Sequence, residues 1–431
     1  MTRGIKEQGP GFPELFRVFL RIGLMSFGGP AAQIALMHRE LVEQRPWLSD
    51  TEFLRGLSFC MLLPGPEAMQ LCTYTGWRLR GVAGGILAGL LFVLPGALVI
   101  ALLTWLYAAY GTLPTVQAAF SGIKAAVIVI VLQALWRLRQ KALHAPVDWG
   151  LACFGFIALF CLGLPFPAVI LSAGLLGMLL KPINREEPAA APYETDLSAS
   201  LGTVLFWSAL WLVPLLSLEL LHNGFLADIG WFFAKLAVVT FGGAYAVLAY
   251  LGQTVVEQHG WITAGQMIDA LGLAETTPGP LILVTQFVAM LAGLTQGGMP
   301  MFLAAGVVAL WATFVPCFLW IFTAAPFIEG LARHPRLGNA LQSITATVTG
   351  VILNLSLWFM AHVLFDRLSA VHLGPVSFAV PEWSSLDAKA AILTLVAILA
   401  SVLLRGKLMP LLVLMAGAGL ALSRPEIASL L

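Results

Sequence analysis

Long apolar stretches separated by short polar segments dominate the chain. Five of them, at 82–107, 120–136, 204–221, 299–323 and 341–363, carry almost no charged side chains. A helix needs about 20 apolar residues to cross the hydrocarbon core of a bilayer, where its backbone groups must be paired within the segment. The pattern therefore predicts membrane-spanning helices.

Glycine and proline interrupt the apolar pattern at four places, and these places repeat. Phe27-Gly28-Gly29 recurs at 241–243, and Pro64-Gly65-Pro66 recurs at 278–280. The offset is the same for both motifs, because position 27 corresponds to 241 and position 64 to 278. We name these four places the FGG and PGP segments. Their common spacing indicates an internal duplication.

Other features recur as well. The helix-start pattern Ser49-x-x-Glu52 returns as Thr263-x-x-Gln266, and the apolar segment 120–136 returns at 341–357. Between the copies, the Pro-, Glu- and Ala-rich stretch 181–203 has the composition of a linker. We expect a first repeat at 1–180, this linker, and a second repeat at 204–431.

Lys and Arg lie on opposite sides of the apolar stretches in the two repeats. In the first repeat they surround the FGG and PGP segments and leave the connection 108–118 without any, whereas in the second repeat the equivalent connection carries Arg333 and Arg336. Cytoplasmic loops collect Lys and Arg, so the repeats are predicted to have inverted topologies, with the N-terminus in the cytoplasm. Inversion requires an odd number of crossings between the FGG segments, and we count five, at 82–107, 119–136, 146–163, 164–180 and 204–221.

Composition supports the membrane class and excludes others. The chain is 59% hydrophobic and 10% charged, with a mean hydropathy of +0.90, whereas a water-soluble domain is about a quarter charged. A formal net charge of +1 gives no basic surface for nucleic acid. We read no removable signal peptide, no metal-ligand spacing and no cofactor motif, and we expect the five cysteines to be small buried apolar residues. The expected class is an all-α integral membrane protein with two inverted-topology repeats.

The FGG and PGP segments predict broken or re-entrant helical hairpins. Proline lacks an amide hydrogen and glycine tolerates positive φ, so each segment ends one helix and starts another. Pro66 and Pro280 suit the first position of a new helix, which would direct its amides and the positive end of its dipole into the break. Four such ends converging near mid-membrane would bind an anion, and an oxyanion is the natural ligand. The alternative is that the segments only kink helices for packing. The candidate backbone ligands are Gly28, Gly29, Gly65, Pro66, Gly242, Gly243, Gly279 and Pro280.

Charged and polar side chains near the breaks are further candidates. Arg21 and Lys235 are equivalent by the repeat and lie in apolar stretches, as does Lys124. Buried cations in hydrocarbon are usually functional, so the first two are predicted to neutralise a dianion, although snorkelling to the interface is the alternative.

Glu67 and Glu275 adjoin the PGP segments and are candidates for proton coupling, with a helix-cap role as the alternative for Glu67. Gln70 and Thr277 are candidate uncharged ligands. Thr73, Thr276 and Gln286 are further donors within reach of the breaks.

Over essentially its whole length the chain resembles the chromate ion transporter (CHR) family in its long, two-domain form. The segments that carry the resemblance are FRVFLRIGLMSFGGPAAQIALMHRELVE, WLSDTEFLRGLSFCMLLPGPEAMQLCTYTGW, FGGAYAVLAYLGQTVVEQHGW and TTPGPLILVTQFVA. The resemblance implies export of chromate across the bacterial inner (plasma) membrane, chromate resistance, and sulfate as a competing analogue. The family's motif residues correspond here to Phe27, Gly28, Gly29, Pro64, Gly65, Pro66, Phe241, Gly242, Gly243, Pro278, Gly279 and Pro280.

The expected function is secondary transport of chromate out of the cytoplasm, driven by the membrane potential and with proton coupling as a further candidate. The nearest alternative is a transporter of sulfate or another oxyanion on the same scaffold. A passive channel could use the same amides. An oxyanion reductase is disfavoured because no cysteine cluster or nucleotide-binding motif is present, so we expect no enzyme activity. The expected partners are chromate and the lipid bilayer, with a homodimer as the candidate assembly.

Overall fold

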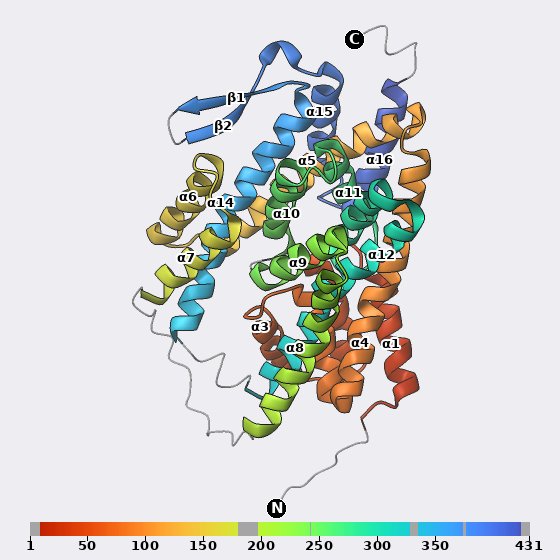
Figure 1. The fold of residues 1–431 in the computed structure, drawn as a ribbon, viewed down its shortest axis with the longest axis vertical. Helices are drawn as coiled ribbons and strands as arrows, with labels where there is room; N and C mark the ends of the chain where they lie inside the picture. The colour runs from red at the N-terminus through yellow and green to blue at the C-terminus, as the bar shows by residue number, and fades with distance from the viewer. Residues whose placement is uncertain (1–8, 180–196, 242, 328–334, 374–375, 424–431) are drawn as a thin grey trace, which may run out of the picture. The chain divides into compact units, whose positions relative to one another are not determined.

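The computed structural model describes residues 9–179, 197–241, 243–327, 335–373 and 376–423 (Figure 1). The predicted ligand Gly242 and most of the predicted linker lie outside the described residues, while 197–203 form the start of a helix. In chain order the elements are α1 (Phe12–Met25), α2 (Gly29–His38), η1 (Arg39–Glu43), α3 (Asp50–Cys60), α4 (Glu67–Tyr110), α5 (Pro114–Ala142), α6 (Pro146–Phe160), α7 (Phe166–Leu179), α8 (Leu197–Leu220), α9 (Gly224–Val239), α10 (Ala244–Gly252), η2 (Gln253–Gln258), α11 (Ala264–Thr276), η3 (Leu281–Leu283), α12 (Val284–Ala324), η4 (Ala325–Phe327), α14 (Pro335–Leu364), β1 (Leu368–Leu373), β2 (Val376–Pro381), η5 (Trp383–Ser385), α15 (Ala388–Leu403) and α16 (Leu408–Leu422).

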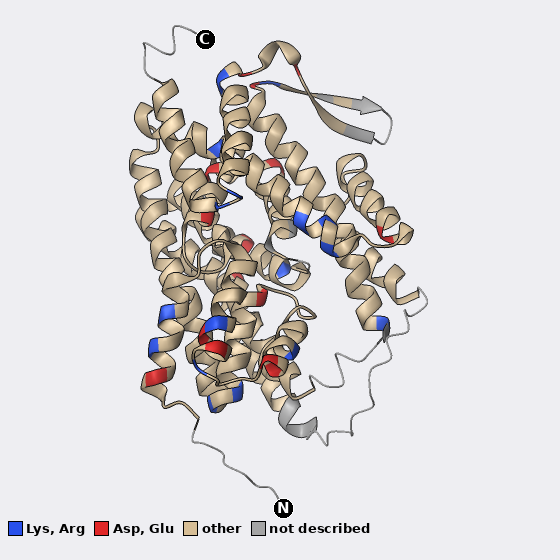
Figure 2. Cartoon of the chain, turned by 180° about the vertical axis from the view of Figure 1, so that it is seen from behind, with Lys and Arg blue, Asp and Glu red and all other residues tan. Residues whose placement is uncertain are grey.

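The predicted all-α membrane class is confirmed. Helices make up nearly all of the described chain, beside one antiparallel hairpin in which Leu368 of β1 faces Pro381 of β2. Among the described residues, five helices are long and apolar enough to cross a membrane: Glu67–Tyr110, Pro114–Ala142, Leu201–Leu220, Leu281–Phe327 and Arg336–Leu364. Figure 2 shows charged residues as isolated segments on otherwise uncharged helices.

Two of the predicted crossings are shorter than expected. Residues 146–163 and 164–180 contain α6 and α7, which have 15 and 14 residues. At a rise of 1.5 Å per residue each is roughly 22 Å long, less than the hydrocarbon thickness of about 30 Å. Without this pair the count between the FGG segments falls from five to three. Because three is also odd, the predicted inversion does not depend on α6 and α7.

Each of the two longest helices consists of two helical arms that fold back against each other. In α4 the chain reverses at Arg80 and Gly81, where φ and ψ leave the helical region. A Cβ on Gly76 would overlap the carbonyl oxygen of Gly84, so the arms before and after the turn lie against each other. In α12 the same reversal occurs at Gly297 and Gly298. The predicted spanning segments 82–107 and 299–323 are therefore the second arms of these hairpins.

The chain forms two compact units, and neither corresponds to a sequence repeat. The first unit takes the described residues within 1–101, 185–243 and 277–334, and the second takes those within 102–184, 244–276 and 335–431. Each unit thus contains segments of both repeats. All four FGG and PGP segments fall in the first unit, apart from the undescribed position 242.

Close packing between helices holds each unit together. In the first unit, α12 packs against α8 and α9, and Trp207 stacks on Phe318 with ring centroids 5.6 Å apart. In the second unit, α5 packs against α11, α14, α15 and α16, and α14 lies along α6 and α7 (Figure 1). Gly122 of α5 and Gly419 of α16 leave no room for a Cβ against the facing backbone. Such contacts let helices associate in lipid, where no hydrophobic force drives them together.

The repeated helix start is confirmed in both copies. The Ser49 hydroxyl accepts from the Glu52 amide and the Glu52 carboxylate accepts from the Ser49 amide, which is a capping box at the start of α3. Thr263 and Gln266 exchange the same two bonds at the start of α11. The π-helical turns η1 and η2 also begin at equivalent positions, 39 and 253.

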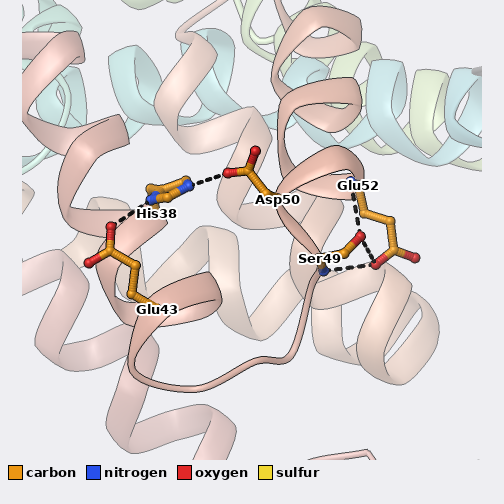
Figure 3. Close-up of polar contacts among 5 residues, drawn as sticks. All are labelled: His38, Glu43, Ser49, Asp50 and Glu52. Carbon is orange, nitrogen blue, oxygen red and sulfur yellow. Dashed lines mark hydrogen bonds and ion pairs between the residues drawn. The ribbon is translucent and has the colours of Figure 1, made fainter.

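A histidine between two carboxylates fixes the connection from α2 to α3 (Figure 3). Nδ1 of His38 lies 3.1 Å from Glu43 Oε1, and Nε2 lies 2.7 Å from Asp50 Oδ1. The hydrogen bond to Asp50, with a smaller contribution from Glu43, raises the pKa of His38 above its ordinary value of 6.5, although burial opposes the shift. The protonated ring is therefore favoured by the folded state.

This arrangement predicts a pH-dependent contribution to stability. Because the pKa is raised on folding, the contribution is fully present below the ordinary value of 6.5 and is lost as the pH rises through the raised pKa. His38→Gln should therefore lower the thermal stability of the purified protein at pH 6 and have little effect at pH 9. Equal destabilisation of the variant at both pH values would contradict this role of the charged ring.

Candidate anion-binding site

The FGG segments end one helix and start the next in the same way in both repeats. α1 ends at Met25, and the Ser26 hydroxyl donates to the Ile22 carbonyl at 2.5 Å. The Thr240 hydroxyl donates to the Leu236 carbonyl at 2.5 Å after the end of α9. Thr240 is equivalent by the repeat to Ser26, and Leu236 is equivalent to Ile22.

Positive φ angles after these residues require glycine. The values of φ are 86° at Gly28, 79° at Gly29 and 104° at Gly243. Glycine alone adopts such angles without a steric penalty from Cβ. α2 then begins at Gly29 with Pro30 in its first turn, as predicted for a break followed by a new helix.

The PGP segments are tight turns that bond reciprocally to the opposite repeat. The Gly65 amide donates to the Thr240 carbonyl at 2.9 Å, and the Gly279 amide donates to the Ser26 carbonyl at 3.0 Å. Gly65 and Gly279 are equivalent by the repeat, as are Ser26 and Thr240. Each PGP turn is therefore held beside the residue that precedes the FGG segment of the other copy, so the breaks form two pairs, each joining the two repeats within the first unit.

Packing behind the two turns is also reciprocal. A Cβ on Gly96 of α4 would overlap the Pro278 carbonyl oxygen. A Cβ on Gly65 would fall 3.1 Å from the Cys317 sulfur of α12. Gly96 and Cys317 are equivalent when the repeats are aligned on their later segments, 120–136 and 341–357. The second arm of each hairpin therefore supports the PGP turn of the opposite repeat.

This geometry changes which groups can face a ligand. The amides of Gly65 and Gly279 already donate to backbone carbonyls. Helix α4 begins at Glu67, and Pro66 accepts from the Gln70 amide, so Pro66 precedes the helix rather than opening it as predicted. Pro280 likewise precedes η3. The amides that remain unbonded within the helix are those of its first turn.

In the first repeat, the chain reverses at the PGP segment instead of kinking. The Arg78 guanidinium pairs with the Glu52 carboxylate, and a Cβ on Gly56 would fall 2.5 Å from the Tyr74 ring. The first arm of α4 therefore lies back along α3. In this repeat the PGP turn forms the tip of a helical hairpin. This agrees with the predicted hairpin and not with the alternative, a simple helix kink.

Gln33 is a structural member of the site that the sequence pattern did not single out. Its side chain is 2% exposed, and Nε2 donates to the carbonyl of Gly279 at 2.7 Å and to that of Ser26 at 3.3 Å. It thus fastens the second PGP turn to the first FGG segment. The sequence feature that could have identified Gln33 is that it is a single amide side chain in an otherwise apolar stretch, which ends at a group of charged residues.

The predicted ligand Gln70 is fully buried beside its own turn. Nε2 donates to the Pro64 carbonyl at 2.7 Å, while Oε1 is buried and has no hydrogen-bond partner among the described residues. Thr277 is also buried, at 4% exposure. Thr73 and Thr276 donate to carbonyls in their own helices, and Gln286 donates to Ala97.

The two equivalent cations have different surroundings. Arg21 Nε lies 3.5 Å from Oε1 of Glu40, a fully buried carboxylate that also pairs with Arg45 at 2.7 Å. The side chain of Arg21 is 49% exposed. Lys235 is exposed, and the residue equivalent to Glu40 in its repeat is Thr254. Arg21 is thus neutralised by an acidic neighbour that the second repeat lacks.

The two proton-coupling candidates also differ. Glu67 is half-buried in the first turn of α4. Glu275 lies at the end of α11 in the second unit, is 2% exposed, and accepts from the Tyr245 hydroxyl at 2.6 Å.

The expectation that all five cysteines are buried is wrong for two of them. Cys60, Cys72 and Cys317 are buried, but Cys153 of α6 is exposed and Cys161, directly after the end of α6, is half-buried.

Comparisons with known proteins converge on one family. The family model described as chromate transporter matches residues 13–178 and 227–422. The chain is 34% identical to the chromate transport protein of Pseudomonas aeruginosa over 373 residues, covering 85% of each chain. It is 32% identical to the chromate transport protein of Cupriavidus metallidurans, covering 79% of this chain and 80% of that one. It is also 32% identical to the probable chromate transport protein of Synechococcus elongatus, covering 79% and 82%. No solved structure matches. A match over most of the chain, in two segments that correspond to the two copies, shows that the protein belongs to the chromate transporter family.

Proposed function

We propose that this protein exports chromate from the bacterial cytoplasm across the inner membrane, driven by the membrane potential. The observation that carries the proposal is the reciprocal pairing of the PGP turns with the residues preceding the FGG segments. It gathers the breaks of both repeats in one unit of a chromate transporter family member. The relatives named as chromate transport proteins support chromate as the substrate.

The bound dianion lies among the four breaks in this proposal. Gly28, Gly29 and Gly243, together with the first turns after Pro66 and Pro280, supply backbone amides to it. Lys235 supplies positive charge. Helix N-termini and bare glycine amides suit an oxyanion because they offer oriented donors and a positive dipole end. Gln70 and Thr277 line the turns as uncharged ligands.

Energetics favours export over uptake. Moving one charge through 100 mV is worth about 2.3 kcal/mol, so a dianion leaving a negative cytoplasm gains roughly 4.6 kcal/mol. This corresponds to a concentration ratio of roughly two thousand without any coupled ion. Uptake against the same potential would need at least three co-transported protons to be electrically favourable.

The membrane arrangement completes the proposal. We place the N-terminus in the cytoplasm and the two repeats in opposite orientations, so that the breaks open alternately to the two sides. Glu67 and Glu275 are the proton-coupling residues that adjoin the PGP segments. Sulfate has the same charge and a similar shape and is the expected competitor.

Flux measurements with a controlled potential test this function. We expect chromate efflux from proteoliposomes containing the purified protein to accelerate when the interior is made negative with valinomycin and a potassium gradient. Sulfate should compete without being transported faster. Chromate flux that does not respond to the potential, or sulfate flux that greatly exceeds it, would contradict chromate export driven by voltage.

A further inference from the structure

A second buried carboxylate lies on α11 and takes no part in the site described above. Asp269 is 4% exposed. Its Oδ2 accepts from the Tyr107 hydroxyl at 2.8 Å and lies 3.5 Å from Lys124 Nζ. Its Oδ1 is buried and has no hydrogen-bond partner among the described residues. All three residues belong to the second unit.

The contacts of Asp269 leave its ionised form incompletely satisfied. A buried carboxylate is stable as an anion only when its charge is paired and both oxygens are hydrogen-bonded. Here one oxygen has no partner among the described residues, and the distance to Lys124 exceeds the roughly 2.7–2.9 Å of a direct charge-assisted hydrogen bond. Lys124 is 29% exposed, so the pair is not sealed from its surroundings. A proton can therefore compete with Lys124 for this carboxylate.

The groups around Asp269 are few. α5 carries Lys124 and, near its C-terminal end, Arg137, Arg139 and Lys141. α11 itself also carries Glu275, which interacts electrostatically with Arg137. Of these cations, Lys124 forms the ion pair with Asp269. Tyr107 comes from the end of α4. Of the other helices packed on α11, α14 has titratable residues only near its two ends, at Arg336 and His362, and α16 has none. Lys124 is therefore the cation that sets the charge state of Asp269.

The cluster is specific to one repeat. The position equivalent to Asp269 in the first repeat is Arg55, and the position equivalent to Lys124 in the second is Thr345. A structural ion pair needed by the fold of both copies would be expected in both. Its presence once indicates a role in a step that the two copies do not share.

We propose that Asp269 binds and releases a proton during each transport cycle, with Lys124 as its charge partner. This inference rests on the proposed chromate export and adds to it a proton site beyond Glu67 and Glu275. The carboxylate takes a proton from water on the outer side to become a carboxylic acid, and it returns that proton to water on the cytoplasmic side. The pair changes from neutral to a net charge of +1 and back. Inward proton movement is the productive direction because the proton then moves down the membrane potential.

The position of Asp269 in the chain gives this step a route to the breaks. α11 ends at Thr276, and the next residues are Thr277 and the second PGP turn. The helix that carries Asp269 is therefore continuous in sequence with the turn whose Gly279 amide donates to Ser26.

The test compares Asp269→Asn with Asp148→Asn in proteoliposomes of the full-length protein. Asp148 is a matched control because it is also buried, at 5% exposure, but caps α6 by accepting from the amides of His144 and Ala145. At zero potential, external pH and chromate are followed together. The wild type and Asp148→Asn should move protons inward as chromate leaves, with efflux faster in acidic external medium. Asp269→Asn should lose the acid stimulation and one of the protons moved per chromate, while chromate–chromate exchange continues.

The double variant Lys124→Gln/Asp269→Asn covers the case in which an unpaired Lys124 prevents folding, and it should behave like Asp269→Asn. An Asp269→Asn variant that keeps the wild-type proton ratio and pH dependence overturns the inference. Loss of exchange together with net efflux in both Asp269 variants also overturns it, because it indicates a structural role. Wild-type chromate efflux without proton movement overturns the inference and leaves chromate export standing, whereas absence of any chromate flux overturns both.

Discussion

Replacing Gly96 by alanine should strongly reduce chromate export without removing the protein from the membrane. A Cβ at this position would overlap the carbonyl oxygen of Pro278. The obstacle is backbone, so a rotamer change cannot relieve it, and the second PGP turn must move away from α4. Overpacking of this kind costs about 1–3 kcal/mol. The displaced turn would also loosen the Gly279 bond to Ser26 on which the site depends.

The measurement is chromate efflux normalised to the amount of protein, with Gly202→Ala as control. Gly202 lies in the helix α8 of the same unit, and a Cβ there would meet nothing within 4 Å. We expect a loss of about 5- to 150-fold for Gly96→Ala, by the free energy just given, and none for Gly202→Ala. Equal activity of the two variants would mean that the position of the second PGP turn does not control transport.

Lys235→Gln should also stop transport, whereas Arg21→Gln should mainly weaken the fold. Thr254 occupies the position equivalent to Glu40, so Lys235 lacks the acidic partner that Arg21 has there. In the proposed site its charge interacts with the dianion instead. Removing a hydrogen bond to a charged group costs about 1.5–3 kcal/mol, or roughly 10- to 150-fold in binding. Arg21 instead compensates the buried Glu40, and its loss leaves that carboxylate to Arg45 alone.

A double variant separates these roles. Arg21→Gln/Glu40→Gln removes both charges, so it should recover thermal stability relative to Arg21→Gln and transport chromate. Chromate affinity and melting temperature are measured for all three variants beside the wild type. The assignment fails if Lys235→Gln transports normally, or if the double variant is as inactive as Lys235→Gln is expected to be.

Local features of the repeats were predictable from the sequence because they depend on residues close together in the chain. The capping boxes at Ser49 and Thr263 and the breaks at the FGG and PGP segments follow from short-range preferences of Ser, Thr, Gly and Pro. The equal offset of the two copies identified which residues would be equivalent. The structure uses these equivalent residues in equivalent ways, because the amides of Gly65 and Gly279 make reciprocal hydrogen bonds to the opposite repeat.

Long-range pairing could not be predicted in the same way. No local preference indicates that Gly65 bonds to Thr240, a residue of the other repeat, or that the amides expected to bind a ligand are used in these bonds. Glu40 lies in a segment rich in charged residues, and its burial against Arg21 depends on how α1 and η1 pack. The lengths of α6 and α7 were overestimated because apolar residues continue beyond the helix ends.

The carboxylates on α11 show a related limit. Asp269 lies in a segment that reads as a moderately polar helix, and its equivalent in the first repeat is Arg55, so the duplication gave no reason to single it out. Its significance comes from Tyr107 and Lys124, which approach from distant positions in the chain. This departure from the repeat, like the presence of Thr254 where the first copy has Glu40, became informative only once the spatial partners of these residues were known.

A structure determined with chromate bound would show where the anion lies, because chromium can be located by its anomalous scattering. We predict one chromium peak within the first unit, beside the glycines at 28, 29 and 243 and the first turns after Pro66 and Pro280, with Lys235 directed toward it. A chromium peak in the second unit, or one in the first unit remote from both PGP turns, would contradict the account.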